Sequence, residues 1–244
     1  TFSVTKAGAS VTLQNLAQVY DGTPRTVDAV SVPAGLTVDI TYDGSPAAPT
    51  NAGAYAVTGT VNSALYAGST NGTLVVSKAL AAIQLQDLSQ TYDGTARPVT
   101  ATTTPAGLTV GITYDGAANA PTNAGSYAVT GTVNHANYQG TTNGTLTIAK
   151  GGQTITFPAI ADQVTTNTLA LGATASSGLA VSYAVVSGPA TLGGVSNLSF
   201  TGAGVVRVAA AQAGNTNWNP AAGVTNTFSV TKAGASVTLQ NLAQ

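Results

Sequence analysis

LTVDITYDG, residues 36–44, alternates apolar and polar side chains and then ends in an Asp-Gly pair. A period of two is typical of a β-strand with one face in a core and the other in solvent, and Asp-Gly is favoured in tight hairpin turns. The stretch therefore predicts a strand followed by a turn. The side chains expected to point inward are Leu36, Val38, Ile40 and Tyr42.

The same pattern returns at residues 108–116, LTVGITYDG, within a longer internal repeat. Ala9–Lys78 aligns without a gap on Ala81–Lys150, and 46 of the 70 positions are identical. On a longer scale, Thr1–Gln18 recurs letter for letter as Thr227–Gln244, with a period of 226 residues. Repetition at fixed periods is the signature of an array of similar folding units.

The rest of the period is a divergent unit, in which apolar side chains alternate with polar ones around Tyr183, Val206 and Phe228. We call residues 9–78 the first repeat, residues 81–150 the second repeat and residues 151–232 the third segment. The expected modules are 1–6, the last strand of a preceding third-type module; 7–78 and 79–150, two sister modules; 151–232, a divergent third module; and 233–244, the first strand of the next first-type module.

Short alternating runs separated by DG, NAG and NG turns predict an all-β fold, in which tandem β-sandwich modules form a head-to-tail rod. Linkers of two to four residues would restrict bending, and the glycine-containing linkers after Lys150 and Lys232 are the expected hinges. The terminal strands, residues 1–6 and 233–244, carry apolar side chains that need cover. We expect a continuous fibre to supply that cover, in preference to strand addition between separate subunits.

Composition narrows the possible partners. Charged residues make up only 6% of the chain, and the net charge is -1. No basic cluster is available for nucleic acid or anionic lipid, so neither partner is expected. The sequence holds no apolar run of about 18 residues, so no membrane insertion is expected in this segment. Cysteine is absent, which excludes disulfides and thiolate metal sites.

Several motifs occur in fixed order through residues 9–150: YDG, TYDG, PTNAGxYAV, NxxxYxG and a closing LxxxK. In these motifs the chain resembles the MBG family, the "mostly beta, glycine-rich" repeats of large bacterial surface proteins. The third segment, with QTITF at 153–157 and QAGNTNWNPA at 212–221, is similar to the Ig-like repeat that accompanies such modules. The resemblance implies an extracellular, adhesin-like stalk or filament of Ig-like sandwiches, and it brings no catalytic residues.

The residues give little support to catalysis or metal binding. The one histidine, His135, has Ser63 as its counterpart in the first repeat, and a required base would not be replaceable in this way. All eight acids are isolated aspartates, which disfavours paired acid–base chemistry and the clustered oxygen ligands that Ca²⁺ needs. The Asp of each YDG motif is expected to form an Asx turn ahead of glycine. We predict no catalytic, cofactor or metal site.

Two sets of residues recur near the module ends. Four lysines close the modules and could in principle form isopeptide crosslinks, but a solvated charge that protects a strand edge is the preferred interpretation. Three aromatic residues occupy comparable places near the final hairpins, where packing in the core is the default expectation. The lysines are Lys6, Lys78, Lys150 and Lys232, and the aromatic residues are Tyr66, Tyr138 and Trp218.

Two functions remain. The first is a structural repeat of an extracellular or cell-surface stalk, fibre or filament, whose partners are further copies of the same repeat. The second is an adhesive module that recognises a glycan or host protein. Trp218, flanked by Asn217 and Asn219, would be the likeliest site for sugar stacking. Exact duplication, low charge and uniform Thr/Asn faces favour the structural interpretation.

Overall fold

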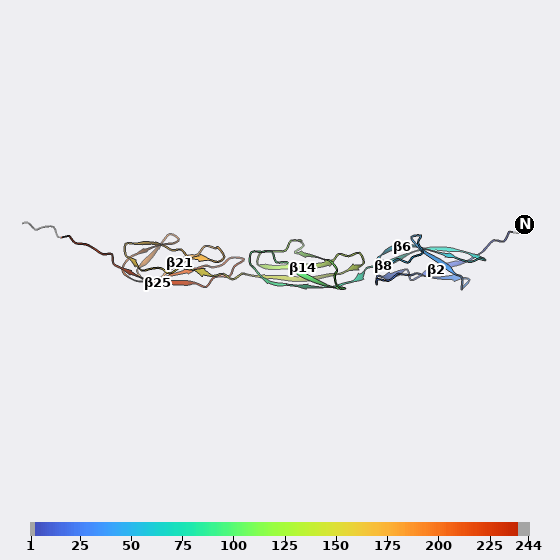
Figure 1. Cartoon of the computed structure of the whole chain (residues 1–244), viewed down its shortest axis with the longest axis horizontal. Coiled ribbons are helices and arrows are strands. Elements are labelled where there is room, and N and C mark those ends of the chain that lie inside the picture. Colours follow the sequence, from blue (N-terminus) through green and yellow to red (C-terminus); the bar gives the residue numbers. More distant parts are fainter. Residues whose placement is uncertain (1–2, 239–244) are drawn as a thin grey trace, which may run out of the picture. The chain divides into compact units, whose positions relative to one another are not determined.

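The computed structural model describes residues 3–238, and every regular element within them is a β-strand (Figure 1). The prediction of an all-β fold is confirmed. Across these described residues, no helix offers the length and apolar character that a membrane span requires.

The first repeat contains a four-stranded sheet of order β3-β8-β6-β5 and a two-stranded sheet of β2 and β4. Strand β3 runs parallel to β8, whereas the other neighbours are antiparallel. A third pair joins β1, which lies in the linker just ahead of the repeat, to β7 in parallel. The strands are β1 (Ala7–Gly8), β2 (Ser10–Gln14), β3 (Ala17–Val19), β4 (Asp28–Val32), β5 (Val38–Tyr42), β6 (Gly53–Val61), β7 (Tyr66–Ala67) and β8 (Ser69–Ser77).

The second repeat has the same arrangement, with a sheet of order β11-β16-β14-β13, a pair of β10 and β12, and a parallel pair of β9 and β15. The equal topology follows from the shared sequence. The strands are β9 (Ala79–Leu80), β10 (Ala82–Gln86), β11 (Ser89–Thr91), β12 (Thr100–Thr104), β13 (Val110–Tyr114), β14 (Gly125–Val133), β15 (Tyr138–Gln139) and β16 (Thr141–Ala149).

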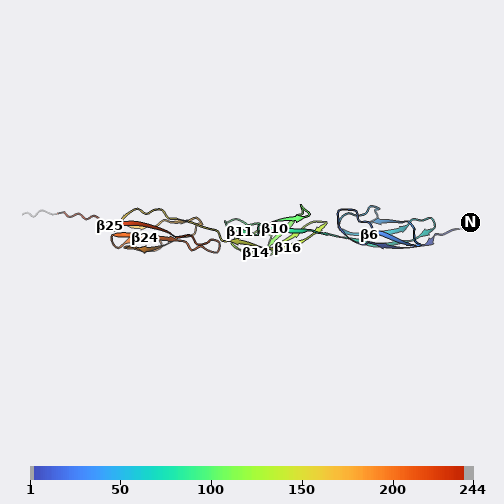
Figure 2. The same cartoon turned by 90° about the horizontal axis from the view of Figure 1, so that it is seen from below.

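The third segment keeps a four-stranded sheet, β18-β25-β24-β21, in which β24 and β25 lie side by side (Figure 2). A three-stranded sheet, β19-β23-β22, and the pair β17-β20 complete it. The strands are β17 (Ile155–Thr156), β18 (Gln163–Val164), β19 (Thr168–Ala170), β20 (Thr174–Ala175), β21 (Ser182–Ser187), β22 (Ala190–Gly193), β23 (Asn197–Phe200), β24 (Gly204–Ala211) and β25 (Val224–Thr231).

The strand and turn predicted from LTVDITYDG are present. Asp43 and Gly44 both have positive φ, 46° and 83°, which a type I′ hairpin turn requires. Two hydrogen bonds close the turn, from the Tyr42 amide to the Ser45 carbonyl at 2.7 Å and in the reverse direction at 2.8 Å. Because Asp-Gly accepts these dihedral angles at low cost, the sequence fixes where β5 ends.

Tyr42 and Tyr114 occupy equivalent buried sites, as predicted, and each is 6% exposed. The Tyr42 hydroxyl accepts a hydrogen bond from the Val27 amide at 2.8 Å, and the Tyr114 hydroxyl accepts one from the Val99 amide at 2.7 Å. Each ring therefore packs in the core while its hydroxyl satisfies a buried amide.

Glycines in the two long strands make room for the facing layer. A Cβ at Gly59 would lie 3.1 Å from Leu13 Cδ2, and a Cβ at Gly72 would lie 3.1 Å from Leu13 Cδ1. Leu13 thus packs over both glycines toward the buried cluster of Val57, Leu74 and their neighbours. Close approach of two β layers explains why the sequence is rich in glycine at strand centres.

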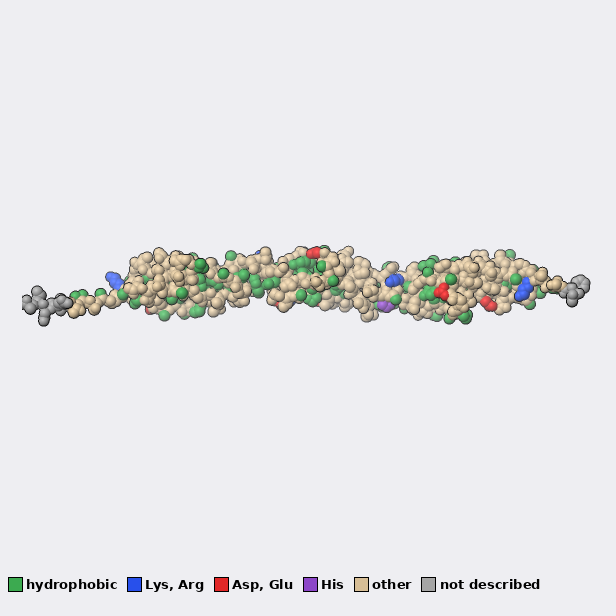
Figure 3. Space-filling model, turned by 90° about the horizontal axis from the view of Figure 1, so that it is seen from above, with side chains coloured by type: hydrophobic (Ala, Val, Ile, Leu, Met, Phe, Trp, Pro, Cys, Tyr) green, Lys and Arg blue, Asp and Glu red, His purple; other side chains and the backbone are tan. Residues whose placement is uncertain are grey.

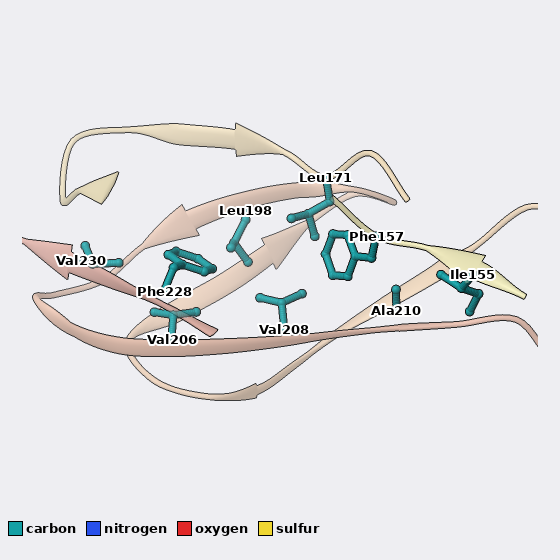
Figure 4. Packing of buried hydrophobic residues seen from close by; sticks show 9 residues of the cluster. All are labelled: Ile155, Phe157, Leu171, Leu198, Val206, Val208, Ala210, Phe228 and Val230. Carbon is teal, nitrogen blue, oxygen red and sulfur yellow. The ribbon is translucent and has the colours of Figure 1, made fainter. Parts of the chain in front are cut away.

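The third segment has the largest core. Its buried residues point into the space between the strands (Figure 4), and the predicted inward positions Val206 and Phe228 are among them. Tyr183, from the first of the three predicted alternating runs, packs against this cluster and is partly buried. The buried set is Ile155, Phe157, Leu171, Leu198, Val206, Val208, Ala210, Phe228 and Val230.

The chain divides into two compact units whose boundary runs through the second repeat. One unit holds the first repeat and most of the second repeat, and the other unit holds the third segment with the rest of the second repeat. The first is Thr1–Leu88, Pro98–Ala120 and Tyr127–Leu146, and the second is Ser89–Arg97, Pro121–Ser126 and Thr147–Gln244. Each linker between repeats therefore lies within one unit.

The predicted terminal strands fall partly on residues 1–2 and 239–244, outside the described residues. Of the remainder, residues 3–6 and 232–238 are exposed and not in strands. Residues 7–14, which have the same sequence as residues 233–240, form β1 and β2 of the first repeat. The pairing of the terminal strands in a fibre stays a prediction.

Candidate functional site: the joints between repeats

The linkers that follow Lys6, Lys78 and Lys150 each dock on a loop of the module that comes next. The first residue of the linker pairs in parallel with an aromatic residue of the loop. The amide of that linker residue donates a hydrogen bond to the carbonyl of the residue just before the aromatic one. The pairs are Ala7–Tyr66, Ala79–Tyr138 and Gly151–Trp218, and the amide bonds go to the carbonyls of Leu65, Asn137 and Asn217 at 2.9 Å each. The Ala79–Tyr138 site, between the first and second repeats, is called the first joint. The Gly151–Trp218 site, between the second repeat and the third segment, is called the second joint.

The lysines take part in the same arrangement. Each exposed Nζ donates a hydrogen bond to a backbone carbonyl in the loop on which its linker docks. The bonds are Lys6 to Ser63 at 2.8 Å, Lys78 to His135 at 2.8 Å and Lys150 to Asn215 at 2.7 Å. The interpretation as a merely solvated charge is thus incomplete, because the ammonium group also clamps the linker to the next repeat.

Aromatic side chains meet edge to face at both joints. Tyr20 and Tyr138 have ring centroids 5.3 Å apart with an interplanar angle of 81°, and Tyr92 and Trp218 are 5.1 Å apart at 89°. Tyr20 and Tyr92 are the tyrosines of the YDG motifs. The default expectation that Tyr138 and Trp218 pack in a core is wrong, since they are partly buried at the joints. Such pairs add about 0.5–1.5 kcal/mol beyond area burial.

A buried amide locks the first joint. The Asn137 Oδ1 accepts a hydrogen bond from the Ala52 amide at 2.9 Å, and Asn137 Nδ2 donates to Asn51 Oδ1 at 3.0 Å. Asn137 is 9% exposed. Two satisfied bonds make the burial of this polar side chain favourable.

The second joint repeats the lock with Asn217. Its Oδ1 accepts from the Ala124 amide at 2.9 Å, and its Nδ2 donates to Asn123 Oδ1 at 3.0 Å. In both joints the TNAG sequence of the PTNAG motif supplies the partners of the lock, the alanine amide as donor and the asparagine Oδ1 as acceptor. Sequence reasoning missed the lock, because its partners are 85 to 94 residues apart.

Glycine permits the close approach of linker and loop. A Cβ at Gly140, the last residue of the NxxxYxG motif, would overlap the Ala81 carbonyl oxygen of the linker. A Cβ at Gly151 would lie 2.6 Å from Trp218 Cζ3. Gly151 is buried and hydrogen-bonded to Asn217 and Asn219 through its backbone, so this glycine serves packing. The hinge expected in this linker stays a prediction.

The residue that opens each loop caps its backbone. His135 Nδ1 accepts a hydrogen bond from the Asn137 amide at 3.1 Å, and Ser63 Oγ accepts from the Leu65 amide at 3.2 Å. In the third segment, Asn215 Oδ1 accepts from the amides of Asn217 and Trp218 at 2.8 and 2.9 Å. Three different side chains thus perform one turn-stabilising task, which explains why His135 is replaceable.

The YDG aspartates form the Asx turns expected from the sequence. Asp21 Oδ1 accepts hydrogen bonds from the Thr23 amide at 2.9 Å and the Thr23 hydroxyl at 2.7 Å, and Asp21 forms an ion pair with Arg25. The bonds from Thr23, with a smaller contribution from Arg25, lower the pKa of Asp21 below its ordinary value. Among the described residues, no group of three or more His, Cys, Asp or Glu side chains is placed to hold a metal ion.

Comparison with known families finds that the MBG domain matches residues 9–80 and again residues 81–152. The match covers both sister repeats, where the sequence motifs had indicated this family. Comparison with curated protein sequences finds no match.

Among solved structures, the chain is similar to Sidekick-1 immunoglobulin domains 1–5, with 14% identity and a TM-score of 0.35 over 88% of this chain and 57% of that one. A three-domain structure of titin has 11% identity and a TM-score of 0.36 over 92% of this chain and 99% of that one. Mouse cadherin-23 EC22-24 has 13% identity and a TM-score of 0.28 over 95% of this chain and 98% of that one. TM-scores of this size do not establish a shared arrangement of the domains.

Proposed function

Because the chain belongs to the MBG domain family, we propose that it is a structural repeat segment of an extracellular bacterial surface stalk, fibre or filament. Its modules would be residues 7–78, 79–150 and 151–232, held in order by the joints, and its partners would be further copies of the same repeat. Like other tandem arrays, such a segment would gain its length by repetition and its cohesion from contacts between neighbours.

The observation that carries this proposal is the docking of a linker on a loop, which is built three times on one plan. Linker pairing and the lysine clamp occur at all three loops, and the aromatic contact and amide lock occur at the first and second joints. Each hydrogen bond contributes about 0.5–1.5 kcal/mol and each aromatic pair a similar amount, so a joint opposes bending by several interactions together. Resistance to bending suits a projecting stalk.

The surface chemistry supports the same proposal. Charged side chains are few and scattered on the face shown in Figure 3, and most of that surface is uncharged. Hydroxyl and amide groups interact with water without creating a strong field, so this surface has no electrostatic preference for nucleic acid or anionic lipid.

No observation favours the alternative of a glycan-binding module at Trp218. The Trp218 ring packs edge to face with Tyr92 and against Gly151, which leaves less of it available for stacking on a sugar. The contacts of Trp218 are those of a joint residue.

Antibodies against residues 1–244 test the proposed location and role. On intact cells that produce the protein, they should label the surface, and external protease should remove the label without lysis. A signal that appears only after lysis would contradict the proposal. A glycan array probed with the same chain, and with Trp218→Ala as its control, tests the alternative; specific binding lost in the variant would favour the adhesive function.

A further inference from the structure

The docking loop of the first repeat differs from the other two docking loops at the position that forms the amide lock. Leu65 stands where Asn137 and Asn217 form the amide locks, and it is 72% exposed. The rest of the loop follows the common plan, with the linker amide of Ala7 bonded to the Leu65 carbonyl and Lys6 bonded to Ser63. The loop is therefore built to receive a neighbour, but its lock position is apolar.

The far end of the third segment differs at the matching position. TNAG at residues 50–53, which supplies Asn51 to the first joint, aligns with TGAG at residues 201–204 ahead of β24. Gly202 thus replaces the asparagine that meets the lock in the other joints. Leu65 has no side-chain amide that needs an acceptor and Gly202 has no side chain to supply one, so the two positions are complementary in their side chains.

The aromatic position of this end has changed as well. The Tyr20 amide bonds to the Ser77 carbonyl at the end of β8, and the Thr165 amide bonds to the Thr231 carbonyl at the end of β25, both at 2.9 Å. Thr165 therefore occupies the place of the YDG tyrosine. The third segment offers neither the amide nor the aromatic ring that the second and third loops require.

Where the repeats of this chain differ in sequence, residues that contact each other change together. Asn15 donates to Asp28 in the first repeat, whereas Thr100 donates to Asp87 at the equivalent places in the second. Ala79 with Tyr138 becomes Gly151 with Trp218, where a Cβ would clash. The replacement of asparagine by Leu65 in the loop and by Gly202 in TGAG follows the same rule if Leu65 and Gly202 contact each other.

The linker sequence agrees. TFSVTKAGASVT occurs at residues 1–12 and again at residues 227–238. In the second occurrence, its first five residues end β25 of the third segment. In the first occurrence, Lys6 and Ala7 dock on the Leu65 loop. One stretch of sequence thus supplies both the last strand of a third segment and a linker that fits the first repeat.

We propose that the Leu65 loop of the first repeat docks on the third segment of the preceding copy of the 226-residue period. The contact lies at the end of that segment that carries Gly202 and Thr165, and it forms a third joint held by apolar contact. The first and second joints identify this partner, because in both of them the docking loop contacts the end of the module that precedes it in the chain. The inference rests on the proposed tandem arrangement of copies, but it concerns one contact and can fail while that function stands.

A chain of two consecutive periods, residues 1–226 followed by residues 1–244, tests the contact by thiol alkylation. The protein has no cysteine, so Leu65→Cys placed in either copy gives a single reactive thiol. Leu65 is exposed in the present chain, and its replacement should not disturb folding. In the downstream copy, which follows a third segment, we expect alkylation to be about tenfold slower or more than in the upstream copy.

Val32→Cys, at an exposed position on β4, is the matched control and should react equally in both copies. Gly202→Arg in the upstream copy should restore the fast rate at downstream Leu65→Cys; a Cβ at Gly202 meets only Pro189 at an ordinary 3.5 Å. Equal rates for Leu65→Cys in the two copies would overturn the proposal. A slow downstream rate that Gly202→Arg leaves unchanged would overturn the assignment of the third segment as the partner. Cell-surface labelling is independent of either result.

Discussion

Asn137→Ala should weaken the first joint without unfolding either repeat. The substitution removes two hydrogen bonds, one from the Ala52 amide and one to Asn51 Oδ1, and leaves the backbone pairing of β9 and β15 in place. At about 0.5–1.5 kcal/mol for each neutral bond, the joint should lose about 1–3 kcal/mol. Because 1.4 kcal/mol corresponds to a factor of ten, this loss equals about a 5- to 150-fold change in the opening equilibrium.

Amide hydrogen exchange measures this change at the site. The Ala52 amide donates to the removed side chain, so its exchange should accelerate by about 5- to 150-fold. The Ala124 amide, which donates to Asn217 in the second joint, is the internal control and should keep its rate. Asn217→Ala should give the reverse pattern, with Ala124 accelerated and Ala52 unchanged.

The side-chain lock would be refuted by an Ala52 rate that does not change in Asn137→Ala. Equal acceleration of Ala52 and Ala124 would also contradict the reasoning, because it would mean that the substitution destabilises the whole chain. Leu65→Ala completes the series, since Leu65 is exposed and should affect neither amide.

Three further changes test the core, the linker and the Asx turn. Tyr42→Phe leaves the buried Val27 amide without its acceptor and should lower the free energy of unfolding by about 1–3 kcal/mol. Tyr42→Ala should lower it by about 3–5 kcal/mol. Hydrogen exchange should show both losses in the first repeat alone, and Tyr55→Phe, at an exposed hydroxyl, should cost less. Gly140→Ala should displace the linker and expose the Ala79 and Ala81 amides to exchange, which unchanged rates would exclude. The folded-state pKa of Asp21 is lowered, so its stabilising contribution is present above the ordinary value of 3.8 and lost as pH falls below it; acid denaturation of Asp21→Asn should show a shallower dependence on pH in that range.

The strands could be predicted from sequence because their evidence is local. Alternation along residues 36–42 follows from the pleat, and the Asp43-Gly44 pair specifies a turn through its own dihedral angles. The internal repeat then extends each prediction from one copy to the other. Tyr42 and Tyr114 were placed correctly for this reason, since they share every neighbour in LTVxITYDG.

The joints could not be predicted in the same way, because their contacts join residues far apart in sequence. Apolar and aromatic residues bury themselves equally well in a core or at a joint, so nothing in Tyr138 or Trp218 alone distinguishes the two. The lysine bonds go to backbone carbonyls, which no side-chain motif records. One signal was present: Leu65 and Asn137 differ inside the otherwise shared NxxxYxG motif, and Gly202 differs inside TNAG.

The differences between the sister repeats also bear on the choice between a scaffold and a binding surface. Four exposed valines of the first repeat have threonine as their counterparts in the second: Val19, Val30, Val32 and Val75 against Thr91, Thr102, Thr104 and Thr147. Each exchange keeps the β-branched shape that suits a strand while it replaces a methyl group with a hydroxyl. A face that recognised a ligand in every copy would need constant chemistry there. At these four positions the outer face keeps only strand-forming shape, whereas linker pairing and the lysine bond recur at all three loops. This division agrees with the proposed structural role, in which each module holds the next one in place.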